Sequence, residues 1–65
     1  MILTLNGQPY DTVASTVAQL LEEKGIAADG TAVAVAEQVV PRSQWQDTPL
    51  TEGADVEILT AVQGG

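Results

Sequence analysis

β-prone residues surround a strong turn signal at the start of the chain. Met1–Leu5 favours β structure, and Gln8–Val13 returns with Tyr10 and Val13 available for a sheet. Asn6-Gly7 between them is the strongest two-residue signal for a hairpin, because a type I′ turn needs positive φ at both positions. The chain is therefore predicted to open with a β-hairpin.

The next segment has the periodicity of a helix. Apolar residues fall on one helical face over about Val17–Lys24. Thr16 and Gln19, three residues apart, fit a capping box at the start of this segment. Gly25 supplies the left-handed residue that commonly ends helices, and Ile26 beyond it can pack back on the last turn. The sequence predicts one helix with both ends specified.

Two short strands are predicted after the helix. Thr31–Ala36 alternates larger and smaller apolar side chains as a well-buried strand does, and this alternation places Val33 and Val35 on one face. A turn at Glu37-Gln38 then leads into Val39-Val40. The two strands are expected to lie side by side.

The order of these elements predicts the fold class. Pro41 limits the fourth strand to a sheet edge, because proline removes a hydrogen-bond donor. Val56–Val62 has the strongest strand pattern in the chain. Together the elements predict an α+β fold of the β-grasp, or ubiquitin-like, type: a mixed five-stranded sheet wrapped round one helix, with the first and last strands side by side. We expect residues 1–61 to form this domain and residues 62–65 a flexible tail.

Two residues between the fourth and fifth strands have side chains of special interest. Trp45, the single Trp of the chain, is predicted to fill the open end of the sheet. Arg42 is one of two basic residues in an acidic chain, so it fits either an internal partner for a carboxylate or a residue of a protein interface. The sequence favours the internal partner and leaves the interface role open.

Composition narrows the classes of function. Nine acidic and two basic residues give a formal charge of −7, which disfavours nucleic acid and anionic membranes as partners. Cys and His are absent, so the usual nucleophile and base pairs and the usual zinc ligands cannot be assembled. We expect no catalytic residue, no metal site and no bound cofactor. Because the first residues resemble neither a signal peptide nor a membrane span, we expect a cytoplasmic protein.

The sequence ends on a diglycine, and this is its strongest functional signal. Gly64 and Gly65 have no Cβ, so the tail formed by Val62, Gln63, Gly64 and Gly65 can enter a slot too narrow for side chains. Four extended residues after Ala61 reach about 13 Å. The pattern predicts a tail, mobile in the free protein, that carries its carboxylate into the active site of a partner enzyme.

The whole chain resembles the sulfur carrier proteins of thiamine biosynthesis, the ThiS family. The segment with Val-Pro-Arg followed by Trp is the most discriminating part, since a terminal diglycine also occurs in other ubiquitin-like carriers. Family members often carry Asn in the turn after the third strand, where this chain has Ala36-Glu37-Gln38. The matching segments are Leu5-Asn6-Gly7, Thr16-Val17, Leu20-Leu21, Val33-Ala34-Val35, Val39-Val40-Pro41-Arg42-Ser43, Trp45, Gly53-Ala54-Asp55-Val56 and Gly64-Gly65.

The resemblance implies a specific cycle. The Gly65 carboxylate would be adenylated by an E1-like, ThiF-type partner that uses ATP and Mg²⁺. It would then be converted to a thiocarboxylate with sulfur from a donor such as a cysteine desulfurase. The carrier would finally dock on a ThiG-type thiazole synthase and give up its sulfur to the forming thiazole ring.

Two alternatives remain open at this point. The first is a carrier of the type of the molybdopterin synthase small subunit, which shares the diglycine but would serve molybdenum cofactor synthesis. The second is a ubiquitin-like binding module whose acidic face docks a basic partner noncovalently. Such binding would tolerate loss of both glycines and would weaken with salt, because exposed charges are screened within about 8 Å at physiological ionic strength.

Overall fold

The computed structural model describes residues 1–61, which form five strands, one α-helix and one 3-10 helix. The sheet has the strand order β2-β1-β5-β3-β4. Strands β1 and β5 are parallel, and the other neighbouring pairs are antiparallel. The elements are β1 (Ile2–Leu5), β2 (Gln8–Asp11), α1 (Val17–Lys24), β3 (Thr31–Val35), β4 (Gln38–Val40), the 3-10 helix η1 (Arg42–Asp47) and β5 (Asp55–Thr60).

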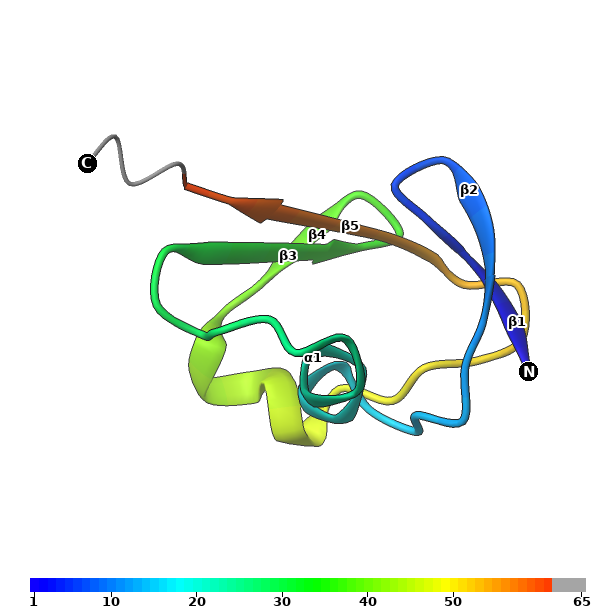
Figure 1. Ribbon diagram of the computed structural model, residues 1–65, viewed down its shortest axis with the longest axis horizontal. Helices are drawn as coiled ribbons and strands as arrows, with labels where there is room; N and C mark the ends of the chain where they lie inside the picture. The colour runs from blue at the N-terminus through cyan, green and yellow to red at the C-terminus, as the bar shows by residue number, and fades with distance from the viewer. Residues whose placement is uncertain (62–65) are drawn as a thin grey trace.

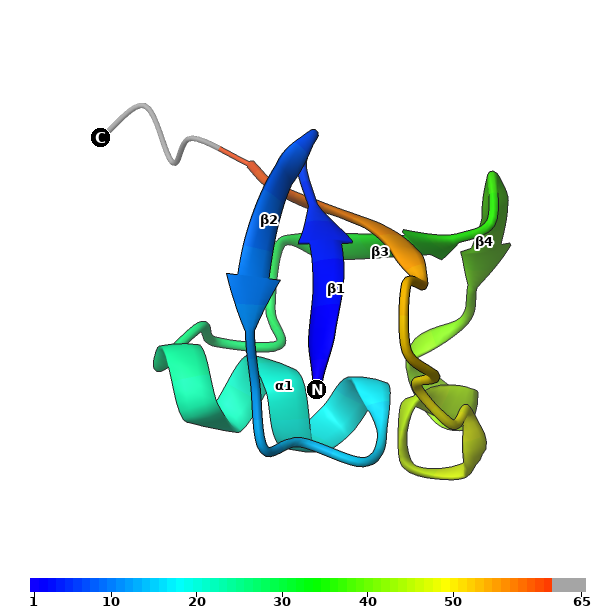
Figure 2. The same cartoon turned by 90° about the vertical axis from the view of Figure 1, so that its right-hand side faces the viewer.

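This arrangement confirms the predicted α+β, β-grasp layout. Both helices lie on one side of the sheet (Figures 1 and 2). The first and last strands pair through Thr4 with Asp55 and Leu5 with Val56. Strand β4 is an edge strand, as Pro41 predicted. The 3-10 helix η1 was not predicted as an element.

The first hairpin turn is formed as expected, and it has an additional role. Asn6 and Gly7 both have positive φ, 50° and 81°. The Asn6 side chain also accepts a hydrogen bond from the Ile58 amide at 2.8 Å and donates to the Ile58 carbonyl at 3.2 Å. The turn residue thus extends the pairing of β1 with β5 beyond the end of β1.

The second strand ends earlier than predicted. It was expected to reach Val13, but β2 ends at Asp11, and the Val13 side chain is 92% exposed. The Thr12 amide still bonds the Met1 carbonyl at 2.9 Å, whereas the Val13 amide donates to the Glu23 carboxylate at 3.2 Å. A helix side chain therefore draws the chain away from the sheet. The first strand starts at Ile2 rather than at Met1.

Helix α1 has the predicted bounds because both of its ends are fixed by local contacts. The Gln19 amide donates to the Thr16 hydroxyl at 3.2 Å, and the Gln19 side chain accepts from the Ser15 amide, one residue before the cap, at 2.7 Å. Gly25 has φ 69°, and its amide bonds the Glu22 carbonyl while the Ile26 amide bonds the Leu21 carbonyl. This pair of bonds is a Schellman motif.

The turn between β3 and β4 lies one residue earlier than predicted. The central turn residues are Ala36 and Glu37, not Glu37 and Gln38, and they have φ 52° and 67°. The strand was expected to include Ala36, but it ends at Val35. The pairing of Val35 with Gln38 leaves a two-residue loop, and such loops favour turns with positive φ at both positions.

The last strand is shorter than predicted. It was expected over Val56–Val62, but β5 covers Asp55–Thr60. The strand starts one residue earlier because Asp55 pairs with Thr4. Its last cross-strand pair is Thr60 with Thr31.

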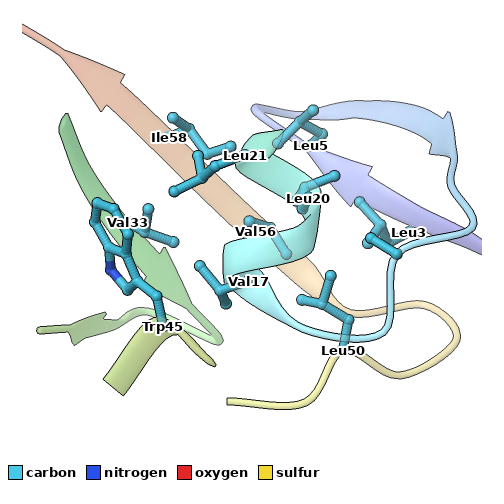
Figure 3. Close-up of a cluster of buried hydrophobic side chains, with 11 residues drawn as sticks. Leu3, Leu5, Val17, Leu20, Leu21, Val33, Trp45, Leu50, Val56 and Ile58 are labelled. Carbon is cyan, nitrogen blue, oxygen red and sulfur yellow. The ribbon is translucent and has the colours of Figure 1, made fainter. Parts of the chain in front are cut away.

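The core lies between the sheet and the two helices (Figure 3). Val33 is buried and Val35 packs against the same cluster, so the predicted face of the third strand is confirmed. The core is aliphatic except for Trp45. Its buried members are Leu3, Leu5, Ala14, Val17, Leu20, Leu21, Val33, Trp45, Leu50, Val56 and Ile58.

Candidate functional site

Strand β5 positions the point from which the predicted tail departs. The Ala61 amide, next after the strand, donates to the Gly30 carbonyl at 2.7 Å, just before β3 begins. In Figure 1, β5 ends on the side of the molecule opposite the amino terminus. The last residues of β5 are held from the β3 side, where Thr60 pairs with Thr31, whereas the contacts from the β1 side end with Asn6 at Ile58.

The predicted tail residues themselves, Val62, Gln63, Gly64 and Gly65, lie outside the described residues. Their role in partner binding, the modification of Gly65, the boundary at residue 61 and the mobility of the tail all stay predictions. The structure does place Ala61, the last described residue, against the Gly30 carbonyl beside the end of β5. A carboxylate four residues beyond Ala61 can lie up to about 13 Å from that anchor.

Arg42 has an internal carboxylate partner, as the sequence favoured. Its Nη1 lies 3.0 Å from Asp29 Oδ1, and both side chains are exposed. Exposed ion pairs of this kind contribute about 0–1 kcal/mol. A partner carboxylate could therefore replace Asp29 at small cost, and the predicted interface role of Arg42 stays a prediction.

Trp45 is a core residue, as expected. Its side chain is 5% exposed, and its indole N–H donates to the Val40 carbonyl at 2.9 Å. This bond ties η1 to the end of β4 and satisfies the polar edge of a buried ring. Beside it, a shallow hollow of about 290 Å³ between α1 and η1 is lined in part by Trp45 and Arg42.

Sequence reasoning missed a carboxylate that joins three segments. Glu23 accepts hydrogen bonds from the Tyr10 hydroxyl at 2.6 Å, from the Thr12 hydroxyl at 2.8 and 2.9 Å, and from the Val13 amide. The Tyr10 hydrogen bond, and next that of Thr12, hold the pKa of Glu23 below its usual value. The same bond to Glu23 raises the pKa of Tyr10. Lys24 Nζ lies 4.6 Å from the centre of the Tyr10 ring.

The contacts of this cluster connect helix α1 with the end of the first hairpin. The carboxylate of Glu23 is occupied by donors from the protein, and its depressed pKa makes it a poor proton acceptor near neutral pH. The adjacent hollow of about 310 Å³ is open and lies along the loop before α1. No sequence signal could have found the cluster, because its donors are 10 to 13 residues away from Glu23.

Several hydroxyl groups of the described residues serve local structure. The Thr16 hydroxyl caps α1, the Thr31 hydroxyl donates to the Ala27 carbonyl, and the Thr48 hydroxyl donates to the Gln44 carbonyl. Within residues 1–61 no group of three or more His, Cys, Asp or Glu side chains is arranged to hold a metal ion. In the same range, no helix is both long and apolar enough to cross a membrane.

Comparison with known proteins gives a consistent result over the whole chain. The sequence model described as the ThiS family matches residues 3–65. The sulfur carrier protein ThiS of Thermus thermophilus is 36% identical over 61 residues, which is 94% of this chain and 95% of the relative. The sulfur carrier protein ThiS of Escherichia coli is 32% identical over 66 residues, with both chains fully covered.

Solved structures agree with these sequence matches. The crystal structure of the thiamine biosynthesis protein ThiS from Geobacter metallireducens superposes with a TM-score of 0.85 at 30% identity, and each chain is fully covered. A solution structure of a thiamine biosynthesis protein from the same organism gives a TM-score of 0.83 at 29% identity. The match covers all of this chain and 88% of the chain in the solution structure.

Proposed function

The chain belongs to the ThiS family, and from this membership we propose that it is a sulfur carrier in thiamine biosynthesis whose working group is the Gly65 carboxylate. The observation that carries the proposal is that the family match extends through residue 65 and so includes the diglycine. The fold supports it, because β5 anchors the start of the tail at one end of the sheet. The chain serves as a co-substrate of other enzymes.

The first step is activation of an unreactive group. A Gly65 carboxylate oxygen attacks the α-phosphate of ATP on an E1-like, ThiF-type enzyme, and pyrophosphate leaves. The product is an acyl-adenylate, whose AMP group is a good leaving group. Mg²⁺ and ATP belong to the partner enzyme, which needs them to neutralise the charge on the phosphates.

The second step places sulfur on the chain. A persulfide sulfur, supplied by a donor such as a cysteine desulfurase, attacks the carbonyl carbon of Gly65, and AMP leaves. A second thiol then reduces the S–S bond of the resulting acyl disulfide, so that a thiocarboxylate stays on Gly65 and the two thiols leave as a disulfide. The glycines matter here because a backbone without side chains fits narrow active sites.

The third step is transfer. The thiocarboxylate is an ionised, soft nucleophile that a ThiG-type thiazole synthase can accept for the forming thiazole ring. The thiocarboxylate sulfur forms a C–S bond to the thiazole precursor. Water then attacks the acyl carbon of Gly65 and the acyl C–S bond breaks, so the sulfur stays on the precursor, the Gly65 carboxylate returns and the chain is used repeatedly. We place this cycle in the cytoplasm, where ATP is available.

Mass spectrometry of the intact chain tests the proposal. The wild-type protein is incubated with ATP, Mg²⁺, a sulfur donor and the adenylating enzyme from the same source. We expect a mass gain equal to the replacement of one oxygen by sulfur, located at Gly65 by fragmentation. A variant without Gly65 and a variant with one Ala added after Gly65 are expected to stay unmodified, with unchanged circular dichroism.

Two results would contradict the proposal. One is an unmodified wild-type chain in a reaction whose enzyme is active on another carrier. The other is sulfur uptake by the variant with the added Ala, since its Gly65 no longer has a free carboxylate. Binding that survives removal of both glycines and falls with salt would instead favour the noncovalent module.

A further inference from the structure

The hollow of about 290 Å³ between α1 and η1 lies on the side of the sheet that both helices cover, which we call the helix side. Pockets that enclose a small molecule begin at about 300 Å³, whereas this hollow is shallow, so it suits a protruding side chain of another protein. Two of its residues are alanines, whose short side chains leave the space open. Its apolar residues are the buried Leu21 and Trp45 and the half-buried Ala18, Ile26 and Ala28.

Two charged residues border the hollow, Arg42 from η1 and Glu22 from α1. Arg42 bonds Asp29 at 3.0 Å, but the two side chains are 66% and 94% exposed, so this pair contributes little. A carboxylate of a bound protein can therefore replace Asp29, and the new bond is stronger where the partner shields it from water. Glu22 repels a carboxylate on the other side of the hollow. The charges thus fit an apolar side chain whose neighbouring Asp or Glu faces η1.

The loop that lines the hollow and the end of β5 lie at the same end of the molecule (Figure 1). This loop contributes Ala28 to the hollow and bonds Arg42 through Asp29. Its next residue, Gly30, accepts the hydrogen bond from the Ala61 amide at 2.7 Å. Because one residue of backbone separates these two bonds, the Ala61 amide lies within about 16 Å of the Arg42 guanidinium. A protein that acts on the end of the tail, up to about 13 Å from Ala61, is therefore close enough to contact the hollow.

The chemistry of the proposed cycle brings two proteins to Gly65 at one time. The acyl-adenylate of the first step is destroyed by water, so the persulfide has to reach it while the activating enzyme still encloses it. The sulfur donor therefore meets a carrier that is already bound to the enzyme. It needs a surface of the carrier that the enzyme leaves free.

The positive charge of Arg42 favours the sulfur donor over the activating enzyme at this hollow. An ATP site contains cations that hold the phosphates, and these repel an Arg placed opposite them. Both basic residues of the chain, Lys24 and Arg42, belong to helices on the helix side. This side is therefore the part of the described surface least suited to face an ATP site.

We propose that the hollow between α1 and η1 is the docking site of the sulfur donor, a protein that carries a persulfide on a cysteine. The donor inserts an apolar side chain and pairs an adjacent Asp or Glu with Arg42. The inference rests on the proposed function and adds a surface for its second step. In that step the terminal persulfide sulfur bonds the carbonyl carbon of Gly65 and AMP leaves, while the activating enzyme still holds the tail.

Two half-reactions separate donor docking from activation. Carrier-dependent exchange of pyrophosphate with ATP needs only the adenylating enzyme. Thiocarboxylate formation, followed by intact mass in the presence of a thiol reductant, also needs the donor. The donor used is the cysteine desulfurase from the same source, loaded with persulfide by L-cysteine. The measured quantity is the donor concentration that gives half of the maximal rate of thiocarboxylate formation.

Three substitutions at the hollow have different expected effects. Arg42→Glu repels the donor carboxylate, so we expect the half-maximal donor concentration to rise at least about tenfold while pyrophosphate exchange is unchanged. Ala28→Phe fills the hollow and is expected to act in the same direction. Asp29→Asn removes the internal competitor for Arg42, so it is expected to lower the half-maximal donor concentration by up to about fivefold. A merely structural role of the ion pair would make Asp29→Asn and Arg42→Glu act alike.

Lys24→Glu and Ala27→Phe are the matched controls. Lys24→Glu makes the same change of charge at the other basic residue of the chain, which is not part of the hollow. Ala27→Phe adds the same ring one residue before Ala28, at an exposed position outside the hollow. Both controls are expected to match the wild type in the two half-reactions. Circular dichroism shows that each variant is folded, and Arg42→Glu, at an exposed side chain, carries the test alone if Ala28→Phe does not fold.

The outcomes distinguish the inference from the proposed function. Equal half-maximal donor concentrations for the wild type and Arg42→Glu would overturn the inference and leave the proposed function intact. Equal losses of pyrophosphate exchange and thiocarboxylate formation in Arg42→Glu would assign the hollow to the activating enzyme, which also overturns the inference. Failure of the wild type in either half-reaction would overturn the proposed function, and the inference with it.

Discussion

The ionised side chain of Glu23 connects helix α1 with the first hairpin through hydrogen bonds. Its carboxylate accepts hydrogen bonds from Tyr10, Thr12 and Val13. The pKa of Glu23 is lowered chiefly by the Tyr10 hydrogen bond and next by that of Thr12. A carboxylate whose pKa is lower in the folded state stabilises the fold above its ordinary pKa. This contribution is lost as the pH falls through the lowered value.

Replacing Glu23 by Gln tests this role. The amide cannot ionise, so the variant is expected to lose stability at neutral pH and to show a weaker decrease of stability on acidification below the ordinary value of 4.5. Urea denaturation followed by Trp45 fluorescence over a series of pH values provides the measurement. Glu22→Gln removes the same charge one position earlier, away from Tyr10 and Thr12. Identical pH profiles for Glu22→Gln and Glu23→Gln would contradict the assignment.

The residues predicted correctly from sequence are those whose partners are close along the chain. Thr16 and Gln19 are three positions apart, so the cap of α1 could be predicted from the local sequence alone. Asp29 and Arg42 are 13 positions apart, and the sequence indicated a carboxylate partner without saying which one. The second role of Asn6 depends on Ile58, 52 positions away, and no local pattern contains it.

At the scale of elements, the helix was predicted to the residue and the strand ends were not. Helix α1 is bounded by its cap and by Gly25, which are local signals. Strand ends depend on pairing partners instead. Strand β2 stops at Asp11 because Glu23 binds the next residues, and β3 stops at Val35 because Ala36 and Glu37 form the turn.

The turn at Ala36 and Glu37 stores strain that a glycine would relieve. Residues other than Gly pay about 1–2 kcal/mol for a left-handed conformation. Glu37 has φ 67°, so Glu37→Gly removes this penalty and costs about 0.5–1 kcal/mol of backbone entropy. We expect a net gain of about 0.5–1 kcal/mol in the free energy of unfolding, measured by urea denaturation.

Glu37→Ala is the control for this prediction. It removes the same carboxylate but keeps a Cβ, so it retains the left-handed penalty. Its stability should stay close to that of the wild type. If Ala and Gly at position 37 raise stability equally, the gain comes from charge and not from the backbone.

At the scale of the whole molecule, the sequence predicted the fold, but not which face of the sheet the helices leave uncovered. Successive side chains of a strand point to opposite faces, so the sequence of β5 already indicates that Leu59 lies on the other face of the sheet from Val56 and Ile58. Which of the two faces is covered depends on where both helices pack, and that follows from the three-dimensional arrangement (Figure 1). The tail prediction rests on Gly64 and Gly65, which the described residues do not include.

Presentation of the predicted tail depends on the folded core, because β5 packs on that core and the Ala61 amide bonds the Gly30 carbonyl just before β3. Leu20 is fully buried at the centre of that core (Figure 3). Leu20→Ala is expected to cost about 3–5 kcal/mol. A domain of this length has a total stability of about 3–10 kcal/mol, so the variant should be partly unfolded at moderate temperature.

This loss of stability should reduce carrier activity because fewer molecules are folded. The chemistry at Gly65 should be unchanged in the molecules that are folded. Urea denaturation followed by Trp45 fluorescence gives the folded fraction, and Val13→Ala, at an exposed position, is the control with a change within about 0.5 kcal/mol. The adenylation rate of Leu20→Ala, measured below KM and divided by its folded fraction, should equal that of the wild type at the same total concentration. A full rate in a largely unfolded sample would mean that the tail alone is the substrate. In that case the folded sheet would have no part in recognition.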